Sequence, residues 1–230
     1  MRRLVVIPAR GGSKRIPRKN IKDFLGRPII AYSIEAALGS GLFDEVMVST
    51  DDEEIAQVAL AHGASVPFLR SPTSSDDHAT TAQVLEEVLE RYKEQGKTFD
   101  CACCLYPTAP FVTSETLKQG YSRLREGGYD SVFPVLRYSY PIWRSLKLED
   151  GKAVMNWPEH LQSRSQDLPP AFHDAGQFYW FRVDAFRESG KLFTANSGAI
   201  EISELQAQDI DSETDWRLAE LKYRLLHDIE

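Results

Sequence analysis

The sequence predicts an α/β fold in which a mainly parallel sheet is covered by helices on both faces. Short apolar runs alternate with amphipathic stretches from the fourth residue onward, a pattern typical of strands that alternate with helices. The 230 residues are 42% hydrophobic and 10% aromatic, which is an ordinary globular composition. This length is sufficient to bury a substantial core, so disorder and coiled-coil architectures are excluded.

Seven elements are expected in the first half of the chain. In order, they are a strand at Leu4–Ile7, a helix opened by Pro28, a strand at Glu45–Ser49, a helix at Glu53–Ala61, a short strand at Val66–Leu69, a helix that begins at Thr80 or Thr81, and a strand at Asp100–Tyr106. The strands are short apolar runs, and the helices carry apolar residues three and four positions apart. We expect Gly39 and Gly41 to end the first helix and Asp51 or Asp52 to cap the second.

The second half continues the alternation around one irregular segment. The expected elements are a helix at Glu115–Arg125 capped by Ser114, a strand at Ser131–Leu136, a strand at Gln177–Arg182 and a helix at Trp216–Leu226 capped by Ser212. Between the two strands, residues 138–175 form short polar and aromatic pieces broken by prolines. Their content of Tyr, Trp and Arg is more typical of a lid or a subunit interface than of a flexible linker, so we interpret them as an insertion.

Two features of the sequence indicate a cytoplasmic protein. No run approaches the roughly 18 apolar residues of a membrane span, and the four apolar residues before Pro8 are too few for the core of a signal peptide. The three cysteines, Cys101, Cys103 and Cys104, lack the C-x-x-C pairs of zinc sites. We interpret them as buried strand residues in a reducing compartment. No membrane partner is expected.

The charge distribution indicates a compact anionic ligand. The net charge is −7, yet residues 1–22 contain eight basic side chains and no acidic one. An acidic protein with so small a basic segment is a poor candidate for binding nucleic acid, which requires an extended basic surface. Positive charge concentrated in a cleft instead suits a small polyanion such as a nucleoside triphosphate.

The segment from Pro8 to Asn20 has the features of a phosphate-binding loop. It follows the first strand, and Gly11 and Gly12 would allow backbone N–H groups to approach phosphate oxygens, while Arg10, Lys14 and Lys19 supply positive charge. The segment matches neither G-x-x-x-x-G-K-[ST] nor G-x-G-x-x-G. Taken alone, it is also compatible with a solvated loop.

A second candidate feature is the D-I-D segment at 209–211. Residues two apart on an extended strand point the same way, so Asp209 and Asp211 would face one site. Two carboxylates together with phosphate oxygens suit Mg²⁺, which prefers oxygen ligands. The alternative is that Asp211 or Ser212 only caps the last helix.

Several segments together resemble the sugar-acid cytidylyltransferases, which activate nonulosonic acids with cytidine monophosphate. The matching segments are I-P-A-R-G-G-S-K-R-I-P-R-K-N-I at 7–21, S-T-D-D at 49–52, F-L-R-S-P at 68–72, Y-P-T-A-P at 106–110, D-A-G-Q-F-Y-W-F at 174–181 and D-I-D at 209–211. They cover nearly the whole chain in the order of the family. The resemblance implies a single cytidylyltransferase domain over residues 1–230, with a three-layer Rossmann-like core, a homodimer, and dimerisation and sugar-site closure by the insertion at 138–175.

The resemblance also implies roles for individual residues. CTP, as co-substrate, would be held by Arg10, Gly11, Gly12, Ser13, Lys14, Lys19 and Asn20, with Arg70 and Ser75 at the cytosine. Mg²⁺ would be held by Asp209 and Asp211, and catalysis would depend on Arg10, Lys14 and Asp211. The acidic nine-carbon sugar would be bound by Tyr106, Arg164, Gln166, His173 and Gln177. A single histidine in an aromatic stretch is also often only a structural hydrogen-bonding group, so both interpretations of His173 stay open.

The choice of sugar rests on one segment. Sialate enzymes usually carry Q-P-T-S-P-L-R where this chain has Y-P-T-A-P-F, and the chain is most similar to family members that act on pseudaminic acid. Tyr106 and Phe111 would pack against the apolar terminus of that sugar. N-acetylneuraminic and legionaminic acid are the alternative substrates. Two other classes of protein, a glycosyltransferase that uses a nucleotide sugar and a non-catalytic CTP-binding regulator, are less consistent with a basic loop near the N-terminus and a D-x-D near the C-terminus.

Overall fold

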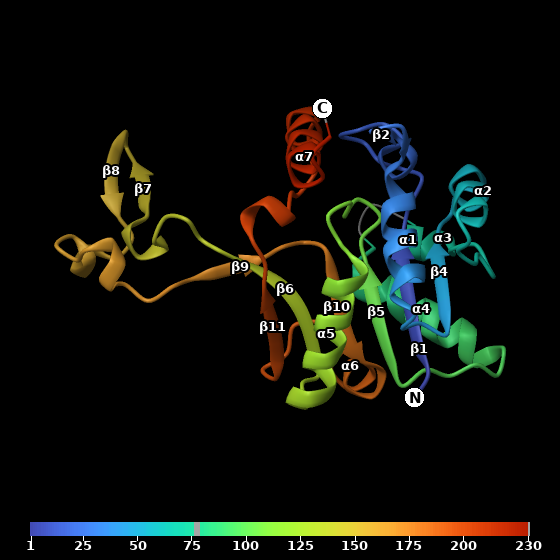
Figure 1. The fold of residues 1–230 in the computed structure, drawn as a ribbon. Helices are drawn as coiled ribbons and strands as arrows, with labels where there is room; N and C mark the ends of the chain where they lie inside the picture. The colour runs from blue at the N-terminus through green and yellow to red at the C-terminus, as the bar shows by residue number, and fades with distance from the viewer. Residues whose placement is uncertain (76–78, 230) are drawn as a thin grey trace.

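A computed structural model describes residues 1–75 and 79–229 and shows one main sheet with helices on both faces (Figure 1). The strand order is β11-β6-β10-β5-β1-β4, and β9 pairs with β6. The bounds are β1 Arg3–Pro8, β4 Glu45–Ser49, β5 Cys101–Leu105, β6 Ser131–Arg137, β9 Phe172–Asp174, β10 Phe178–Arg182 and β11 Ser197–Glu201. Strands β4, β1, β5, β6 and β11 share one direction, whereas β10 and β9 run opposite to them. The prediction of a mainly parallel sheet is therefore confirmed.

The helices form the two outer layers. Their bounds are α1 Ile29–Ser40, α2 Glu53–Ala61, α3 Pro72–Ser75, α4 Thr81–Glu94, α5 Ser114–Gly127, α6 Val183–Ser189 and α7 Glu213–Leu226. Because side chains alternate across a strand, Val5 and Ile7 of β1 pack with α1, α2 and α5, whereas Leu4 and Val6 pack with α4 and α6. The expected three-layer arrangement is present. None of the described helices is both long and apolar enough to cross a membrane.

A separate small core lies at the edge of the sheet where β1 ends. Ile16, Phe24, Tyr32, Ile210 and Trp216 belong to this cluster. It joins the loop after β1 to α1 and α7. This loop contains the 3₁₀ helix η1 Lys19–Ile21 and the short strands β2 Asp23–Phe24 and β3 Arg27–Pro28. The N-terminal basic segment and the C-terminal acidic segment are thus packed against each other.

Most of the segment that follows β6 forms an arm that extends away from the sheet (Figure 1). The arm contains β7 Leu146–Glu149, β8 Lys152–Met155 and the 3₁₀ helices η2 Ile142–Arg144, η3 Pro158–His160 and η4 Ser165–Asp167. The chain returns through β9, whose pairing with β6 belongs to the main sheet. The insertion expected at 138–175 therefore includes one short strand of that sheet at its end.

Three local predictions are wrong. Val66–Leu69 is not a strand: a single bridge joins Ser65 to Met47, and Pro67 has no N–H with which to extend the pairing. The N-cap of α5 is Thr113 rather than Ser114, and the Ser114 hydroxyl instead donates to the Ala36 carbonyl at 3.0 Å. Gly39 lies inside α1, whose last residue is Ser40, so only the second part of that prediction is confirmed: Gly41 is the C-cap, with a positive φ of 63°.

Candidate active site

The loop after β1 is held in place by the carboxylates that follow β4. The Gly11 N–H donates to Asp51 Oδ1 at 2.9 Å. A Cβ at position 11 would lie 2.7 Å from Asp52 Oδ2, so only glycine fits this close approach. Arg18 donates to both carboxylate oxygens of Asp52, at 2.5 and 3.0 Å. The Gly11 N–H was expected to approach a phosphate oxygen, but in the structure it donates to the Asp51 carboxylate instead.

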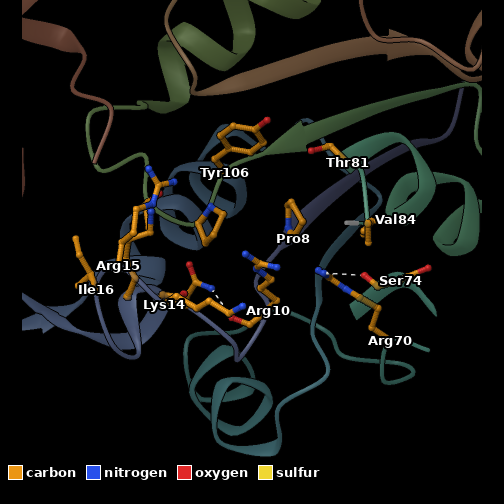
Figure 2. A pocket seen from close by; sticks show the side chains of 16 residues that line it. Pro8, Arg10, Lys14, Arg15, Ile16, Arg70, Ser74, Thr81, Val84 and Tyr106 are labelled. Atoms are coloured by element: carbon orange, nitrogen blue, oxygen red, sulfur yellow. Dashed lines mark hydrogen bonds between the residues drawn. The ribbon is translucent and has the colours of Figure 1, made fainter. Parts of the chain in front are cut away.

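A first cavity of about 300 Å³ opens above this loop (Figure 2). Arg10, Lys14 and Arg70 are arranged around it, and Tyr106 and Thr81 lie across from them. Six of the residues predicted to bind CTP line it: Arg10, Ser13, Lys14, Lys19, Asn20 and Arg70. Arg15 lines it as well, and five basic side chains in one cavity of this size produce the concentrated positive potential that a polyanion requires.

Two of these residues also fix the shape of the cavity. Asn20 is buried, and its Nδ2 donates to the Arg10 carbonyl at 2.9 Å. Lys19 Nζ donates to the Ile210 carbonyl at 2.7 Å, which joins the basic loop to the segment before α7. Burial lowers the pKa of Lys19, and the nearby carboxylate of Asp211 opposes that shift.

Arg70 forms part of the opposite wall. Its Nη2 donates to the Ser49 carbonyl at 2.7 Å and its Nη1 donates to the Ser74 carbonyl at 3.4 Å, so it joins the end of β4 to α3. Burial lowers its pKa. Ser74 lines the cavity, whereas Ser75 is not among the described lining residues and donates its hydroxyl to the Ser71 carbonyl at 2.7 Å.

The D-I-D segment shows the predicted alternation of burial, although it belongs to no strand. Ile210 is buried in the small core, while Asp209 and Asp211 face outward. Asp211 accepts from Arg15 Nη1 at 2.8 Å, and Lys19 Nζ lies 3.7 Å from it. Desolvation and the like charge of Asp211 raise the pKa of Asp209. The helix cap is Ser212, so Asp211 does not serve as one.

These two carboxylates fit a divalent cation only together with other oxygen ligands. Among residues 1–75 and 79–229, no cluster of three or more His, Cys, Asp or Glu side chains is placed to hold a metal ion. Burial, and after it the like charge of Asp211, raises the pKa of Asp209, and a cation bound beside the two carboxylates would favour the ionised form. One or two carboxylates plus substrate phosphates is the usual set of Mg²⁺ ligands in phosphate chemistry.

A second cavity, of about 610 Å³, adjoins the first, and Tyr106 lines both. It lies between the start of the arm and the segment before α7, and its charged lining residues include Arg137, Asp174, Asp209 and Lys222. His173 also lines it, and its ring packs at a tilt against that of Tyr138, with a centroid separation of 4.8 Å. Arg137 and Lys222 were not predicted as site residues, whereas Asp174 begins the D-A-G-Q-F-Y-W-F segment that carries the family resemblance.

The structure separates the other predicted sugar-binding residues from this cavity. Gln177 is buried. Its side-chain Nε2 donates to the backbone carbonyl of Gln206 at 2.6 Å, and its backbone carbonyl accepts from the Tyr106 N–H at 2.9 Å. It therefore supports the wall that carries Tyr106. Phe111 is buried in the small core against Tyr223, so the expected packing of Phe111 on a sugar is wrong. Arg164 and Gln166 lie in the arm, away from the described lining of both cavities, and Arg164 pairs with Asp167 at 3.1 Å.

Comparison with known proteins establishes the family. The family model described as Cytidylyltransferase matches residues 4–220, so the chain belongs to the cytidylyltransferase family. It is 44% identical over 229 residues to a pseudaminic acid cytidylyltransferase of Campylobacter jejuni, covering 99% of both chains. It is 34% identical to a CMP-N,N'-diacetyllegionaminic acid synthase of Legionella pneumophila, covering 96% of this chain and 95% of that protein.

A solved structure supports the fold. A CMP:2-keto-3-deoxy-manno-octonic acid synthetase in complex with CTP superimposes with a TM-score of 0.72 at 19% identity, covering 99% of this chain and 100% of the other. At that identity the likeness extends to the fold alone. The nucleotidyltransferase core expected from the sequence is therefore confirmed.

Proposed function

We propose that the protein transfers CMP from CTP to the anomeric hydroxyl of a nonulosonic acid, pseudaminic acid, and releases pyrophosphate. The observation that carries this proposal is the 44% identity over essentially the whole length to a pseudaminic acid cytidylyltransferase. The two adjoining cavities fit the need to bring two substrates together. The free, buried thiols of Cys101, Cys103 and Cys104 suit a cytoplasmic enzyme, as the use of CTP also does.

CTP would occupy the first cavity. Arg10, Lys14 and Lys19 would contact its phosphates, and Arg70 with Ser74 would lie near the base. Ser13 and Gly12 remain candidates for contacts to phosphate oxygens. Ser13 lines the cavity, and no atom lies within 4 Å of the point where a Cβ at position 12 would be placed. Charge-assisted contacts of this kind are stronger than neutral ones and hold the α-phosphate for in-line attack.

Mg²⁺ would be held by Asp209, Asp211 and phosphate oxygens. When bound, it would neutralise the phosphates and lower the pKa of the attacking hydroxyl. Arg15 and Lys19, which pair with Asp211 in the structure, would then be released toward the phosphates. Arg10 and Lys14 would stabilise the charge that develops on the departing pyrophosphate.

The sugar acid would occupy the second cavity, beside Tyr106 and His173. Its anomeric hydroxyl would then face the first cavity across Tyr106, where the α-phosphate is expected. The new bond joins the sugar oxygen to the α-phosphorus, and the bond to the pyrophosphate oxygen breaks. The proton of the hydroxyl passes to solvent.

The arm would make the protein a homodimer. Leu146 and Leu148 of β7 are 59% and 80% exposed, and a hairpin with such apolar side chains is not stable in isolation. The arm of one copy would close the sugar site of the other, which would bring Arg164 and Gln166 to the sugar acid. This arrangement accounts for their position outside the cavities of their own chain.

The experiment that tests the function measures pyrophosphate release from CTP and Mg²⁺ with a panel of sugar acids. We expect release that depends on the sugar acid and is fastest with pseudaminic acid. Binding of CTP without release would indicate a regulator. Transfer from a preformed CMP-sugar to an acceptor would indicate a glycosyltransferase.

A further inference from the structure

The second cavity contains a carboxylate whose position is fixed by neighbouring groups, that of Asp174. The Tyr179 hydroxyl donates to Asp174 Oδ2, and the Gly176 N–H donates to Asp174 Oδ1 at 3.0 Å. Asp174 ends β9 and is exposed on the wall of the cavity. Both oxygens are thus held from within the chain, while the carboxylate stays accessible to a ligand.

Tyr179 is itself rigidly placed. It is the second residue of β10, is 4% exposed, and pairs with Cys104 of β5. Its ring packs against those of Tyr106, Phe133 and Phe193, with centroids 5.5 to 5.8 Å apart. A phenol held on several sides cannot rotate away, so its hydroxyl defines where the Asp174 carboxylate points.

The carboxylate keeps unused capacity to accept hydrogen bonds. An ionised carboxylate offers about four acceptor positions, of which Tyr179 and Gly176 occupy two. No described basic side chain pairs with Asp174 in a salt bridge. The remaining positions suit a ligand group that donates, such as a hydroxyl or an amide N–H.

The other charges of the cavity set the orientation of an acidic sugar. Arg137 and Lys222 line the same cavity, and Lys222 Nζ uses two of its three donors on the carbonyls of Glu204 and Ala207, at 3.1 and 2.9 Å. A substrate carboxylate is attracted toward these cations and repelled by the carboxylates of Asp174, Glu204 and Asp209, which line the same cavity. A donor group on another part of the sugar is then directed to Asp174.

We infer that Asp174 is a specificity-determining residue that accepts a hydrogen bond from a hydroxyl or acylamino N–H of the sugar acid, and that Tyr179 positions it. The inference rests on the proposed function and adds a residue that selects among sugar acids. A site built to accept from a donor discriminates against a sugar that does not place one there, because the bound sugar shields the carboxylate from water and leaves the acceptor unpaired.

The test compares Asp174→Ala, Asp174→Asn and Tyr179→Phe with the unmodified enzyme. For each, kcat and KM are measured with pseudaminic, legionaminic and N-acetylneuraminic acid at saturating CTP, and KM for CTP is measured separately. Because a hydrogen bond to a charged acceptor is lost, we expect Asp174→Ala to raise KM for the preferred sugar at least about tenfold. KM for CTP should stay within about twofold, since CTP occupies the other cavity.

The selectivity ratio separates a specific role from a structural one. We expect the ratio of kcat/KM between the preferred sugar and the poorest one to fall at least about fivefold in Asp174→Ala. The ratio should fall less in Tyr179→Phe. It should fall least in Asp174→Asn, because the amide retains an acceptor oxygen. Tyr121→Phe, the same substitution in a tyrosine of α5 outside both cavities, should leave the ratio unchanged.

Two outcomes would overturn the inference in distinguishable ways. If the unmodified enzyme is active but all three variants retain its selectivity ratio, Asp174 does not select the sugar, and the proposed function stands. If the unmodified enzyme releases no pyrophosphate with any sugar acid, the proposed function fails and the inference fails with it. Melting temperatures close to that of the unmodified enzyme verify that each variant is folded.

Discussion

At the residue scale, the proposed chemistry depends on side chains that bring charge to one point. Arg10 and Lys14 come from a single loop and could be identified from the sequence, because basic residues beside glycines after a strand are a local pattern. Arg137, Asp174 and Lys222 come from β6, β9 and α7. These residues are far apart in the chain and form no local sequence pattern. The second cavity could therefore be identified only from the tertiary structure.

Lys14→Ala tests the phosphate role of the basic loop. We expect kcat/KM to fall by about two orders of magnitude or more, because a charge-assisted contact to a phosphate contributes roughly 1.5–3 kcal/mol and strengthens in the transition state. Steady-state kinetics provide the measurement. Lys93→Ala, on the surface of α4, is the control and should behave as the unmodified enzyme. An unchanged kcat/KM in Lys14→Ala would make this residue a solvated surface charge.

Asp211→Asn tests the metal role of the acidic pair. Turnover should be abolished at limiting Mg²⁺, because a carboxylate ligand is lost. Affinity for CTP without metal, measured by calorimetry, should stay within about tenfold, since the basic loop is intact and Arg15 and Lys19 lose a competing partner. Full activity of the variant at limiting Mg²⁺ would remove Asp211 from the metal site.

At the element scale, the sequence located most strands and helices because their signals are local. The bounds of β4 and α2 agree with the prediction at both ends, and Asp52 is the cap of α2. The errors arise where tertiary contacts decide. Val66–Leu69 has strand-like side chains but is interrupted by Pro67, and β11 pairs with β6 in a region without a strong sequence pattern.

Asp52→Ala tests how α2 supports the phosphate loop. Asp52 caps α2 by accepting from the Ile55 N–H at 3.0 Å and binds Arg18, and Arg18 is the main cause that lowers its pKa from 3.8 to about 2. A lowered pKa means that this stabilisation is present above pH 3.8 and is lost as the pH falls toward 2. We expect the free energy of unfolding at pH 7 to fall by about 1–2 kcal/mol.

Urea denaturation at several pH values, with KM for CTP in parallel, measures both effects. The difference in stability between the two proteins should shrink as the pH falls from about 4 to 2. KM for CTP should rise, because Arg18 lies in the loop. Asp184→Ala is the matched control. Asp184 lies in the first turn of α6 and also pairs with an arginine, Arg182. Because this pair lies outside the first cavity, KM for CTP should not change. A pH-independent difference would show that the Asp52 carboxylate is not responsible.

At the scale of the whole molecule, the sheet places the ends of β1, β4 and β5 side by side, and both cavities open near this edge.

Leu148→Asp tests the function proposed for the arm. A charge at this exposed position should convert a dimer to a monomer and raise KM for the sugar acid, as measured by analytical ultracentrifugation and kinetics. Leu221→Asp, at an exposed position of α7, should leave assembly unchanged. A dimer that persists in Leu148→Asp would place the interface elsewhere.

A competition experiment with one enzyme preparation measures the choice of sugar most directly. CTP, Mg²⁺ and equal concentrations of pseudaminic acid and N-acetylneuraminic acid are mixed, and the CMP-linked products are quantified by mass spectrometry at low conversion. We expect CMP-pseudaminic acid to exceed the other product by at least about a hundredfold, because Tyr106 would pack against the apolar terminus of that sugar and Asp174 would accept a hydrogen bond from it. Equal amounts of the two products, or an excess of CMP-N-acetylneuraminic acid, would contradict the assigned substrate.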